Sequence, residues 1–188
     1  MAKYLFVDIC GTLYQENTTL AYLKFMSRRS LLMRIKWITT AVYAKLFCNS
    51  SSHIHIRIRM LRGLTAQAIK QSMQDFIPTL HPIQDSFNFL QAHSNCKTWL
   101  VSATLTEIAS EIQHKQGLDH VIASTLRYSS SGICTGEYSS FLLDEGKLAH
   151  VKKELQPIDI SNAEYITDDV IADSDLCNAV LKIHAVSN

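Results

Sequence analysis

Five short apolar runs recur along the chain, at residues 4–9, 98–101, 121–124, 165–167 and 183–186. Most of the segments between them space their apolar residues as helices do. Apolar runs of this length that alternate with helical patterns are typical of a parallel sheet covered by helices on both faces. The pattern therefore predicts an α/β fold, a Rossmann-like doubly wound parallel sheet.

The sequence also predicts three helices and a hairpin. Residues 82–90 begin with a proline, as first helical turns often do, and carry their apolar residues on one face. Residues 104–115 open with a capping-box pattern, and Gly117 would end that helix. A third helix covers residues 145–155. Residues 127–138 contain a serine- and glycine-rich turn between two short runs, which predicts a β-hairpin.

The alternation of strand and helix patterns is interrupted directly after the first apolar run. A helical repeat predicts an amphipathic helix from the positions of Leu31, Ile35, Ile38 and Val42. Residues 54–60 alternate with period two, as a strand does, but their apolar positions also fit a helix, so both interpretations stay open. Residues 49–52 are expected to form a loop.

The segment after the first apolar run also differs from the rest of the chain in charge. Between Asn17 and Gln74 there are ten Lys and Arg and no Asp or Glu, so all 17 acids lie elsewhere and the net charge of +1 conceals a strongly basic part. A basic unit attracts anions. We expect residues 17–79 to form a small basic helical cap, inserted after the first strand of a core domain made of residues 1–16 and 80–188.

The remaining composition narrows the class of protein. A chain of 188 residues with 47% hydrophobic content suits one core domain that carries an insertion. The five cysteines are scattered and form no C-x-x-C pair, which indicates reduced thiols in a cytoplasmic protein. The first apolar run is too short for a signal peptide because Asp8 ends it. Cations within residues 31–47 argue against a membrane span.

A carboxylate at the end of the first run is the starting point for the chemistry. Asp8 follows that run and is itself followed by Gly11 and Thr12. Open α/β sheets bind ligands at the carboxyl ends of their strands. An acid in this place is more often a turn residue than a nucleophile, so its weight depends on companions later in the chain.

Three later segments place polar side chains in comparable positions. Ser102 and Ala103 end a predicted strand and precede a helix, whose N-terminus favours an anion. Lys147 lies near the start of another helix, and two lysines further into that helix are weaker candidates. Three carboxylates follow the next predicted strand, namely Asp168, Asp169 and Asp173.

The four segments, taken in order, resemble the motifs of the haloacid dehalogenase (HAD) superfamily, and most of all its phosphoserine-phosphatase-like branch with a helical cap. The resemblance implies hydrolysis of a phosphorylated small molecule through an aspartyl-phosphate on Asp8, with Mg²⁺ as cofactor. The catalytic residues that it implies are Asp8, Cys10, Thr12, Ser102 and Lys147. The phosphate-binding residues are Gly11, Thr12, Ser102, Ala103 and Lys147. The metal site would comprise Asp8, the carbonyl of Cys10, and Asp168 with Asp173, or else Asp169 with Asp173.

One residue departs from the family pattern. Family phosphatases carry a second aspartate two residues after the nucleophile, where it protonates the leaving group and later activates water; this chain has Cys10. Losing a general acid or base costs roughly 10² to 10⁴ in rate. We therefore expect slow turnover with metal and phosphate binding retained. Cys10 is disfavoured as the nucleophile itself, because neighbouring carboxylates raise the pKa of a thiol.

Rival functions stay open at this point. A catalytically weak or binding-only protein for an anionic or membrane-associated ligand is favoured by Cys10 and by the basic cap, which would then touch the membrane peripherally. A haloacid dehalogenase-type hydrolase would use Asp8 without a metal, which the acidic cluster at 168–173 argues against. Nucleic-acid binding is disfavoured because the cap contains no recognisable DNA- or RNA-reading module. Neither the substrate nor the oligomeric state can be predicted.

Overall fold

The fold is built on one six-stranded sheet, in a computed structural model that describes residues 4–47, 53–155 and 160–186. The strand order is β4-β3-β2-β1-β5-β6. The strands are β1 (Tyr4–Val7), β2 (Lys97–Leu105), β3 (His120–Tyr128), β4 (Cys134–Ser140), β5 (Ala163–Thr167) and β6 (Lys182–Ala185). All neighbours pair in parallel except β3 and β4, which form the predicted antiparallel hairpin. The predicted α/β class and parallel sheet are confirmed.

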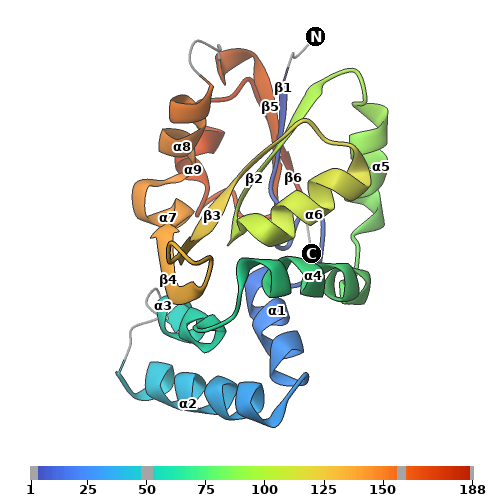
Figure 1. Cartoon of the computed structure of the whole chain (residues 1–188). Coiled ribbons are helices and arrows are strands. Elements are labelled where there is room, and N and C mark those ends of the chain that lie inside the picture. Colours follow the sequence, from blue (N-terminus) through green and yellow to red (C-terminus); the bar gives the residue numbers. More distant parts are fainter. Residues whose placement is uncertain (1–3, 48–52, 156–159, 187–188) are drawn as a thin grey trace.

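Helices cover both faces of this sheet (Figure 1). On one side lie α5 (Gln84–Ala92) and α6 (Thr106–Gln116). On the other side lie α7 (Leu142–Glu145), α8 (Lys147–Glu154) and α9 (Ser174–Cys177), and a 3₁₀ turn, η4 (Ile160–Asn162), leads into β5. This arrangement explains why the central strands read as continuous apolar runs, since both of their faces are covered.

The first strand is buried on both faces. Leu5 and Val7 pack in one hydrophobic cluster, and Phe6, between them, packs in another. Side chains alternate across a strand, so the two clusters lie on opposite faces of the sheet. Ile108 of α6 belongs to the first cluster and Val151 of α8 to the second. Because β1 is packed on both faces, its position in the sheet is fixed. The position of Asp8, which follows β1 directly, is fixed with it.

The described residues between 17 and 79 are mostly helical and lie beyond the carboxyl ends of the strands (Figure 1). They comprise α1 (Thr18–Ser27), α2 (Leu31–Phe47), α3 (His53–Arg57), η2 (Ile58–Leu61), α4 (Ala66–Phe76) and η3 (Ile77–Thr79). Residues 54–60, which the pattern left open between strand and helix, are therefore helical. The loop predicted at 49–52 lies outside the described residues.

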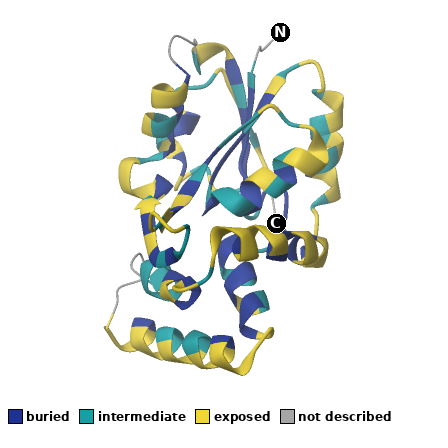
Figure 2. Ribbon diagram, in the orientation of Figure 1, coloured by how far each residue is buried: buried dark blue, intermediate teal, exposed yellow. Residues whose placement is uncertain are grey.

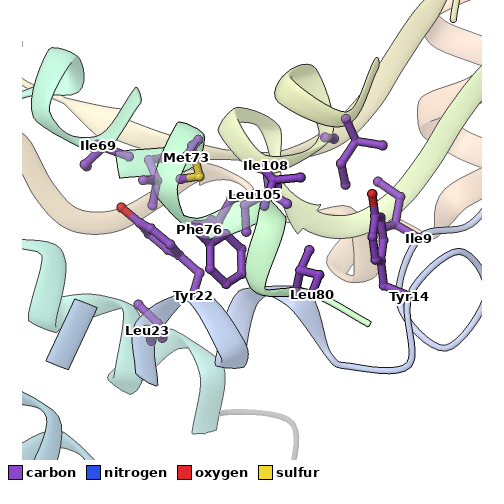
Figure 3. Close-up of a cluster of buried hydrophobic side chains, with 14 of the residues drawn as sticks. Ile9, Tyr14, Tyr22, Leu23, Ile69, Met73, Phe76, Leu80, Leu105 and Ile108 are labelled. Atoms are coloured by element: carbon purple, nitrogen blue, oxygen red, sulfur yellow. The ribbon is translucent and has the colours of Figure 1, made fainter. Parts of the chain in front are cut away.

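A shared core joins these helices to the sheet (Figure 3). Tyr22 of α1 packs edge-on against Phe76 of α4, with ring centroids 5.2 Å apart, and its hydroxyl forms a 2.8 Å hydrogen bond with Ser72. Leu105 of β2 and Ile108 of α6 belong to the same cluster. The position of α1 relative to the sheet is thus fixed by buried contacts.

Backbone hydrogen bonds also join residues 63–66 to the hairpin. The amide of Gly63 donates to the carbonyl of Cys134, and the amide of Cys134 donates to the carbonyl of Leu64. The amide of Ala66 donates to the carbonyl of Gly132. The segment between η2 and α4 therefore follows the edge formed by the hairpin.

Helix starts were the least accurate part of the prediction. The capping box at 104–107 is wrong, because β2 continues through Leu105 and the hydroxyl of Thr104 instead bonds with Thr18, 2.6 Å away. The expected stop at Gly117 is confirmed by its left-handed backbone, φ 65°. The helix expected over 145–155 is divided at Gly146, whose φ of 82° ends α7 before α8 begins.

The second helix is the outermost element of the fold. Met33 and Ala44 are its buried residues and face the rest of the protein, whereas the predicted apolar stripe of Leu31, Ile35, Ile38 and Val42 is exposed. The helix was predicted correctly, but its most apolar stripe points away from the core. No helix among the described residues is long and apolar enough to cross a membrane.

Candidate active site

The candidate site lies where the strand order reverses. Asp8 follows β1 and Asp168 follows β5, and these strands are neighbours between which the direction of winding changes. Open α/β sheets form a crevice at such a point. A cavity of about 430 Å³ there is lined by nine of the ten predicted residues. They are Asp8, Cys10, Gly11, Ser102, Ala103, Lys147, Asp168, Asp169 and Asp173.

Lys147 connects the predicted nucleophile to the acidic cluster. Its ammonium nitrogen lies 3.1 Å from Oδ1 of Asp8 and 2.8 Å from Oδ1 of Asp173. The three side chains are at least nine-tenths buried. A buried cation between two carboxylates can offset charge on both and on an anion that enters the cavity.

Two hydroxyls hold Asp173 in place. Tyr165 and Thr167, which share one face of β5, donate hydrogen bonds of 2.7 and 2.6 Å to Oδ2 of Asp173. Tyr165 also accepts a 2.9 Å hydrogen bond from Lys147. Neither residue was predicted to belong to the site, because in the sequence both read as ordinary strand residues. Both carboxylate oxygens of Asp173 are thus in contact with Lys147, Tyr165 or Thr167, and its predicted part in a metal site stays a prediction.

Burial and neighbouring charges together set the pKa values of Asp8 and Lys147. Burial raises the pKa of Asp8, and the neighbouring Asp173 adds to this, while Lys147 lowers it in part. For Lys147, burial alone would lower the pKa, but the two carboxylates Asp8 and Asp173 outweigh it and raise the pKa. The two carboxylates thus keep the amine charged despite its burial.

Thr12 and Gly11 bring the loop after β1 against the loop after β5. The hydroxyl of Thr12 donates to Oδ1 of Asp168 at 3.1 Å and accepts from the amide of Asp168 at 2.9 Å. Gly11 has φ 70°, and a Cβ placed there would lie 2.0 Å from Oδ2 of Asp168. Thr12 is fully buried and is the one predicted site residue that does not line the cavity. Its predicted contact with phosphate stays a prediction.

Ser102 presents a buried hydroxyl to the site. It is 1% exposed, and its Oγ has no hydrogen-bond partner of proper geometry among the described residues. Its proximity lowers the pKa of both Asp8 and Cys10, although burial raises each of them more. A buried hydroxyl without a partner costs free energy unless a ligand or water satisfies it. Ser102 is therefore suited to bind an oxygen of a ligand.

The sulfur of Cys10 is directed toward the start of α1. Its Sγ accepts a 3.4 Å hydrogen bond from the amide of Thr18 and lies 3.2 Å from the Thr18 hydroxyl. Burial, and then the charge of Asp8, raise the pKa of the Cys10 thiol. A neutral thiol is a poor nucleophile. The surroundings of Cys10 thus disfavour its thiolate, and the assignment of Asp8 as the attacking group stays a prediction.

The oxygen donors of the site are of the chemical kind that magnesium binds. Mg²⁺ prefers one or two carboxylates, with water and substrate phosphate completing its octahedron. Asp8 and Asp168 come from the two adjoining loops, and Asp169 uses Oδ1 to accept a 2.9 Å hydrogen bond from the amide of Ala172. Among the described residues, no group of three or more His, Cys, Asp or Glu is arranged so that it could hold a metal ion. The donors fit a hydrated Mg²⁺ better than a zinc-type site.

A larger groove adjoins the site cavity and was not predicted. It has a volume of about 960 Å³ and shares four lining residues with the cavity around Asp8, namely Asn17, Ile54, Phe141 and Leu143. The rest of its lining combines apolar residues and cations of α1, α2 and α3, such as Lys24, Trp37 and Arg57, with the acids Glu16 and Asp144. The groove could be recognised only in the folded chain, because its walls come from distant parts of the sequence.

A family model for haloacid dehalogenase-like hydrolases matches residues 5–176. The chain belongs to this family. The matched range includes Asp8, Ser102, Lys147 and Asp168, so all four predicted motifs lie within it. No curated protein matches the chain.

Solved structures show that the HAD fold extends over almost the whole chain. A protein of unknown function from Bordetella pertussis Tohama I is 19% identical and has a TM-score of 0.78 over 98% of this chain and 90% of its own. A phosphoserine phosphatase in apo form is 15% identical, with a TM-score of 0.60 over 94% and 83%. A phosphoserine phosphohydrolase-like protein from Francisella tularensis subsp. tularensis SCHU S4 is 17% identical, with a TM-score of 0.61 over 97% and 86%. At these identities the likeness concerns the fold.

Proposed function

We propose that this HAD protein is a magnesium-dependent phosphohydrolase that cleaves a small phosphate ester through an aspartyl-phosphate on Asp8. The observation that carries the proposal is the contact of Lys147 with both Asp8 and Asp173 beside the unpartnered hydroxyl of Ser102. Phosphoryl transfer depends mainly on positioning and on charge neutralisation. A buried carboxylate, a fixed cation and a free hydroxyl in one cavity supply these requirements.

In the first half-reaction a carboxylate oxygen of Asp8 attacks phosphorus, and the bond from phosphorus to the ester oxygen breaks. Lys147 and the hydroxyl of Ser102 bind the phosphoryl oxygens, and the amide of Ala103, which lines the same cavity within β2, adds a donor. Asp173, held by Tyr165 and Thr167, keeps the ammonium of Lys147 in place.

The leaving alcohol needs a proton, and the second half-reaction needs a base. Water attacks the aspartyl-phosphate in that step and releases phosphate. Cys10 stands where a proton donor and base would act, and its neutral thiol is a poor base because burial and Asp8 raise its pKa. Turnover should therefore be slow, and limited by the hydrolysis of the intermediate.

Magnesium would be held by Asp8, the carbonyl of Cys10 and one carboxylate of the loop after β5, with Asp168 preferred over Asp169. Asp168 lies against Gly11 and Thr12, which belong to the loop that carries Asp8. Bound Mg²⁺ would supply further positive charge for the phosphate, as metal ions do in phosphoryl transfer.

The groove beside the site would hold the alcohol part of the substrate. In this proposal residues 17–79 act as the cap and residues 1–16 and 80–188 as the core domain. The groove combines Trp37 with the cations Lys24 and Arg57 and with the acids Glu16 and Asp144, which suits an ester that carries both an apolar portion and polar groups.

We propose to test a panel of phosphorylated metabolites with and without Mg²⁺. This experiment shows both whether the chain hydrolyses phosphate esters and whether hydrolysis requires the metal. The expected result is release of inorganic phosphate that requires Mg²⁺ and is absent in Asp8→Asn. Release that persists in Asp8→Asn would contradict the proposal.

A binding-only role is the second candidate, and Cys10 is the observation that favours it. In that case a phosphate ester would bind, with a dissociation constant measurable by calorimetry, but no phosphate would be released. No phosphorylated Asp8 would be detected by mass spectrometry either.

A further inference from the structure

The solvent-exposed face of α2 carries apolar side chains, where polar side chains are usual. Five apolar side chains recur every three or four positions along it and are each 50% to 75% exposed, namely Leu31, Ile35, Ile38, Val42 and Leu46. Residues with this spacing form one stripe along a helix. Figure 2 shows α2 as the outermost helix, with exposed residues along the side that faces away from the protein.

The opposite face of α2 is the one that packs against the protein. Met33 and Ala44 are buried there. The guanidinium of Arg57 lies 4.4 Å from the ring centroid of Trp37, and Lys36 donates a 2.8 Å hydrogen bond to the carbonyl of Arg62. These contacts fix how the helix is rotated, so the apolar stripe is held outward.

Exposed cations border the stripe. Arg34 and Lys45 are eleven residues apart, which is about three helical turns, so they lie along the same edge of the stripe. Arg28 and Arg29 lie in the turn before α2 and are also exposed. The sequence has no Asp or Glu from Asn17 to Gln74 that could oppose them. Arg29 does pair with Asp75, at 3.0 Å, outside that window.

We propose that α2 is a docking helix that lies flat on an anionic lipid bilayer. Helices that bind in this way combine an apolar stripe with Lys and Arg near the headgroups, and each cation near an anionic surface contributes about 1 kcal/mol. The stripe would enter the boundary between headgroups and acyl chains, and Arg34 and Lys45 would contact lipid phosphates. This proposal concerns the surface of α2 and stands independently of the proposed activity.

A second copy of the chain is a weaker match for the same surface. Two α2 helices packed face to face in antiparallel order would bring Arg34 of one near Lys45 of the other, and neither stripe carries an acid to pair with them. Like charges across an interface are unfavourable. An anionic bilayer satisfies both the apolar stripe and its cations.

Docking would also orient the groove next to the candidate site. Trp37, on the inner side of α2, is one of the residues that line this groove. A protein held by α2 would therefore keep the groove within about one helix diameter, roughly 10 Å, of the bilayer.

The test is co-sedimentation of the whole chain with vesicles of phosphatidylcholine, with and without phosphatidylglycerol. We expect binding to the vesicles that contain phosphatidylglycerol, and weaker binding as salt is raised. Val42→Asp places a charge in the middle of the stripe and should lower the partition coefficient on the order of tenfold or more. Leu181→Asp is the matched control, because Leu181 is 61% exposed and lies outside residues 17–79; it should bind as the wild type does.

Two outcomes would overturn the proposal. The first is that the wild type does not bind vesicles with phosphatidylglycerol. If, in that case, light scattering shows a dimer that Val42→Asp dissociates, the stripe binds a second copy of the chain instead. The second is that Val42→Asp and Leu181→Asp bind equally. If thermal unfolding shows that Val42→Asp is not folded, the double variant of Arg34→Gln with Lys45→Gln replaces it, with binding again expected to fall about tenfold or more.

Discussion

The ammonium nitrogen of Lys147 lies 3.1 Å from Oδ1 of Asp8, and both side chains are more than nine-tenths buried. Because the same nitrogen pairs with Asp173, removing it would leave two buried carboxylates without a cation. Lys147→Met should therefore lower the free energy of unfolding by about 3 to 5 kcal/mol, the usual cost of breaking a buried ion pair. Chemical denaturation measures this loss.

A double-mutant cycle with Asp173→Asn provides the control. If the pairing causes the loss, Lys147→Met should cost less in the Asp173→Asn background than in the wild type. Equal costs in both backgrounds would show that Lys147 acts through packing alone.

Replacing Asp8 by asparagine should abolish phosphate release and leave the fold intact. The amide nearly matches the carboxylate in shape but is a poor nucleophile, and Lys147 keeps its contact with Asp173. Phosphate release and thermal unfolding measure the two effects. Substantial residual turnover with a normal unfolding transition would remove Asp8 as the nucleophile.

Cys10→Asp should accelerate turnover by roughly 10² to 10⁴, the usual contribution of a general acid and base. The new carboxylate would occupy the place where the Thr18 amide already donates to the sulfur of Cys10. The gain in the first half-reaction should be larger for an alkyl phosphate than for p-nitrophenyl phosphate, whose leaving group needs little protonation. Rates measured on both esters test this order.

Trapping of the intermediate gives an independent measure of the same substitution. The wild type should accumulate phosphorylated Asp8, detected by rapid-quench mass spectrometry, because no base activates the water that hydrolyses the aspartyl-phosphate. The Cys10→Asp variant should not accumulate it. A variant no faster on any ester, with no intermediate in either protein, would indicate that the site has lost phosphatase chemistry.

Asp168→Ala should raise the Mg²⁺ concentration needed for half-maximal activity more than Asp169→Ala does. Asp168 contacts the loop that carries Asp8, whereas Asp169 accepts a hydrogen bond from the amide of Ala172. Loss of a side-chain acceptor for a backbone amide costs about 1 kcal/mol, so the unfolding of both variants is measured beside the magnesium titration. The reverse order would move the ligand to Asp169.

Stability at acid pH should depend on Glu164. The hydrogen bond from His184 lowers the pKa of Glu164 below its ordinary value of 4.5, and nearby Lys182 and His93 act in the same direction. A carboxyl with a lowered pKa stabilises the fold above its ordinary pKa, and this contribution is lost as pH falls through the lowered value. Glu164→Gln should therefore reduce the slope of unfolding free energy against pH below 4.5. An unchanged slope would contradict the role of this pair.

The sequence was informative wherever a local pattern has one structural solution. Apolar runs between helical segments predicted the parallel sheet, and residues at strand ends gathered at one edge because parallel strands share an orientation. The capping box failed because its first residue, Thr104, is still part of β2 and bonds with Thr18, a contact made across 86 positions of the chain. Local preference could not anticipate that partner.

Two further features required the folded chain. Tyr165 and Thr167 read as ordinary strand residues, and only the position of Asp173 shows that they hold its carboxylate. The periodicity of α2 predicted a helix with an apolar stripe, but nothing in that pattern says whether the stripe faces the core. The inner contacts of α2, such as that of Arg57 with Trp37, decide the question.

The hydrogen bonds between residues 63–66 and the β3–β4 hairpin restrict how the molecule can open. Hinged movement of all helices of residues 17–79 as one rigid body would break the bonds of Gly63, Cys134 and Ala66. We therefore expect access to Asp8 to depend on displacement of α2 and α3, while α4 and α1, which Tyr22 and Thr18 hold in place, stay attached to the core. Amide hydrogens at Gly63 and Ala66 should accordingly exchange more slowly with deuterium than those of α2.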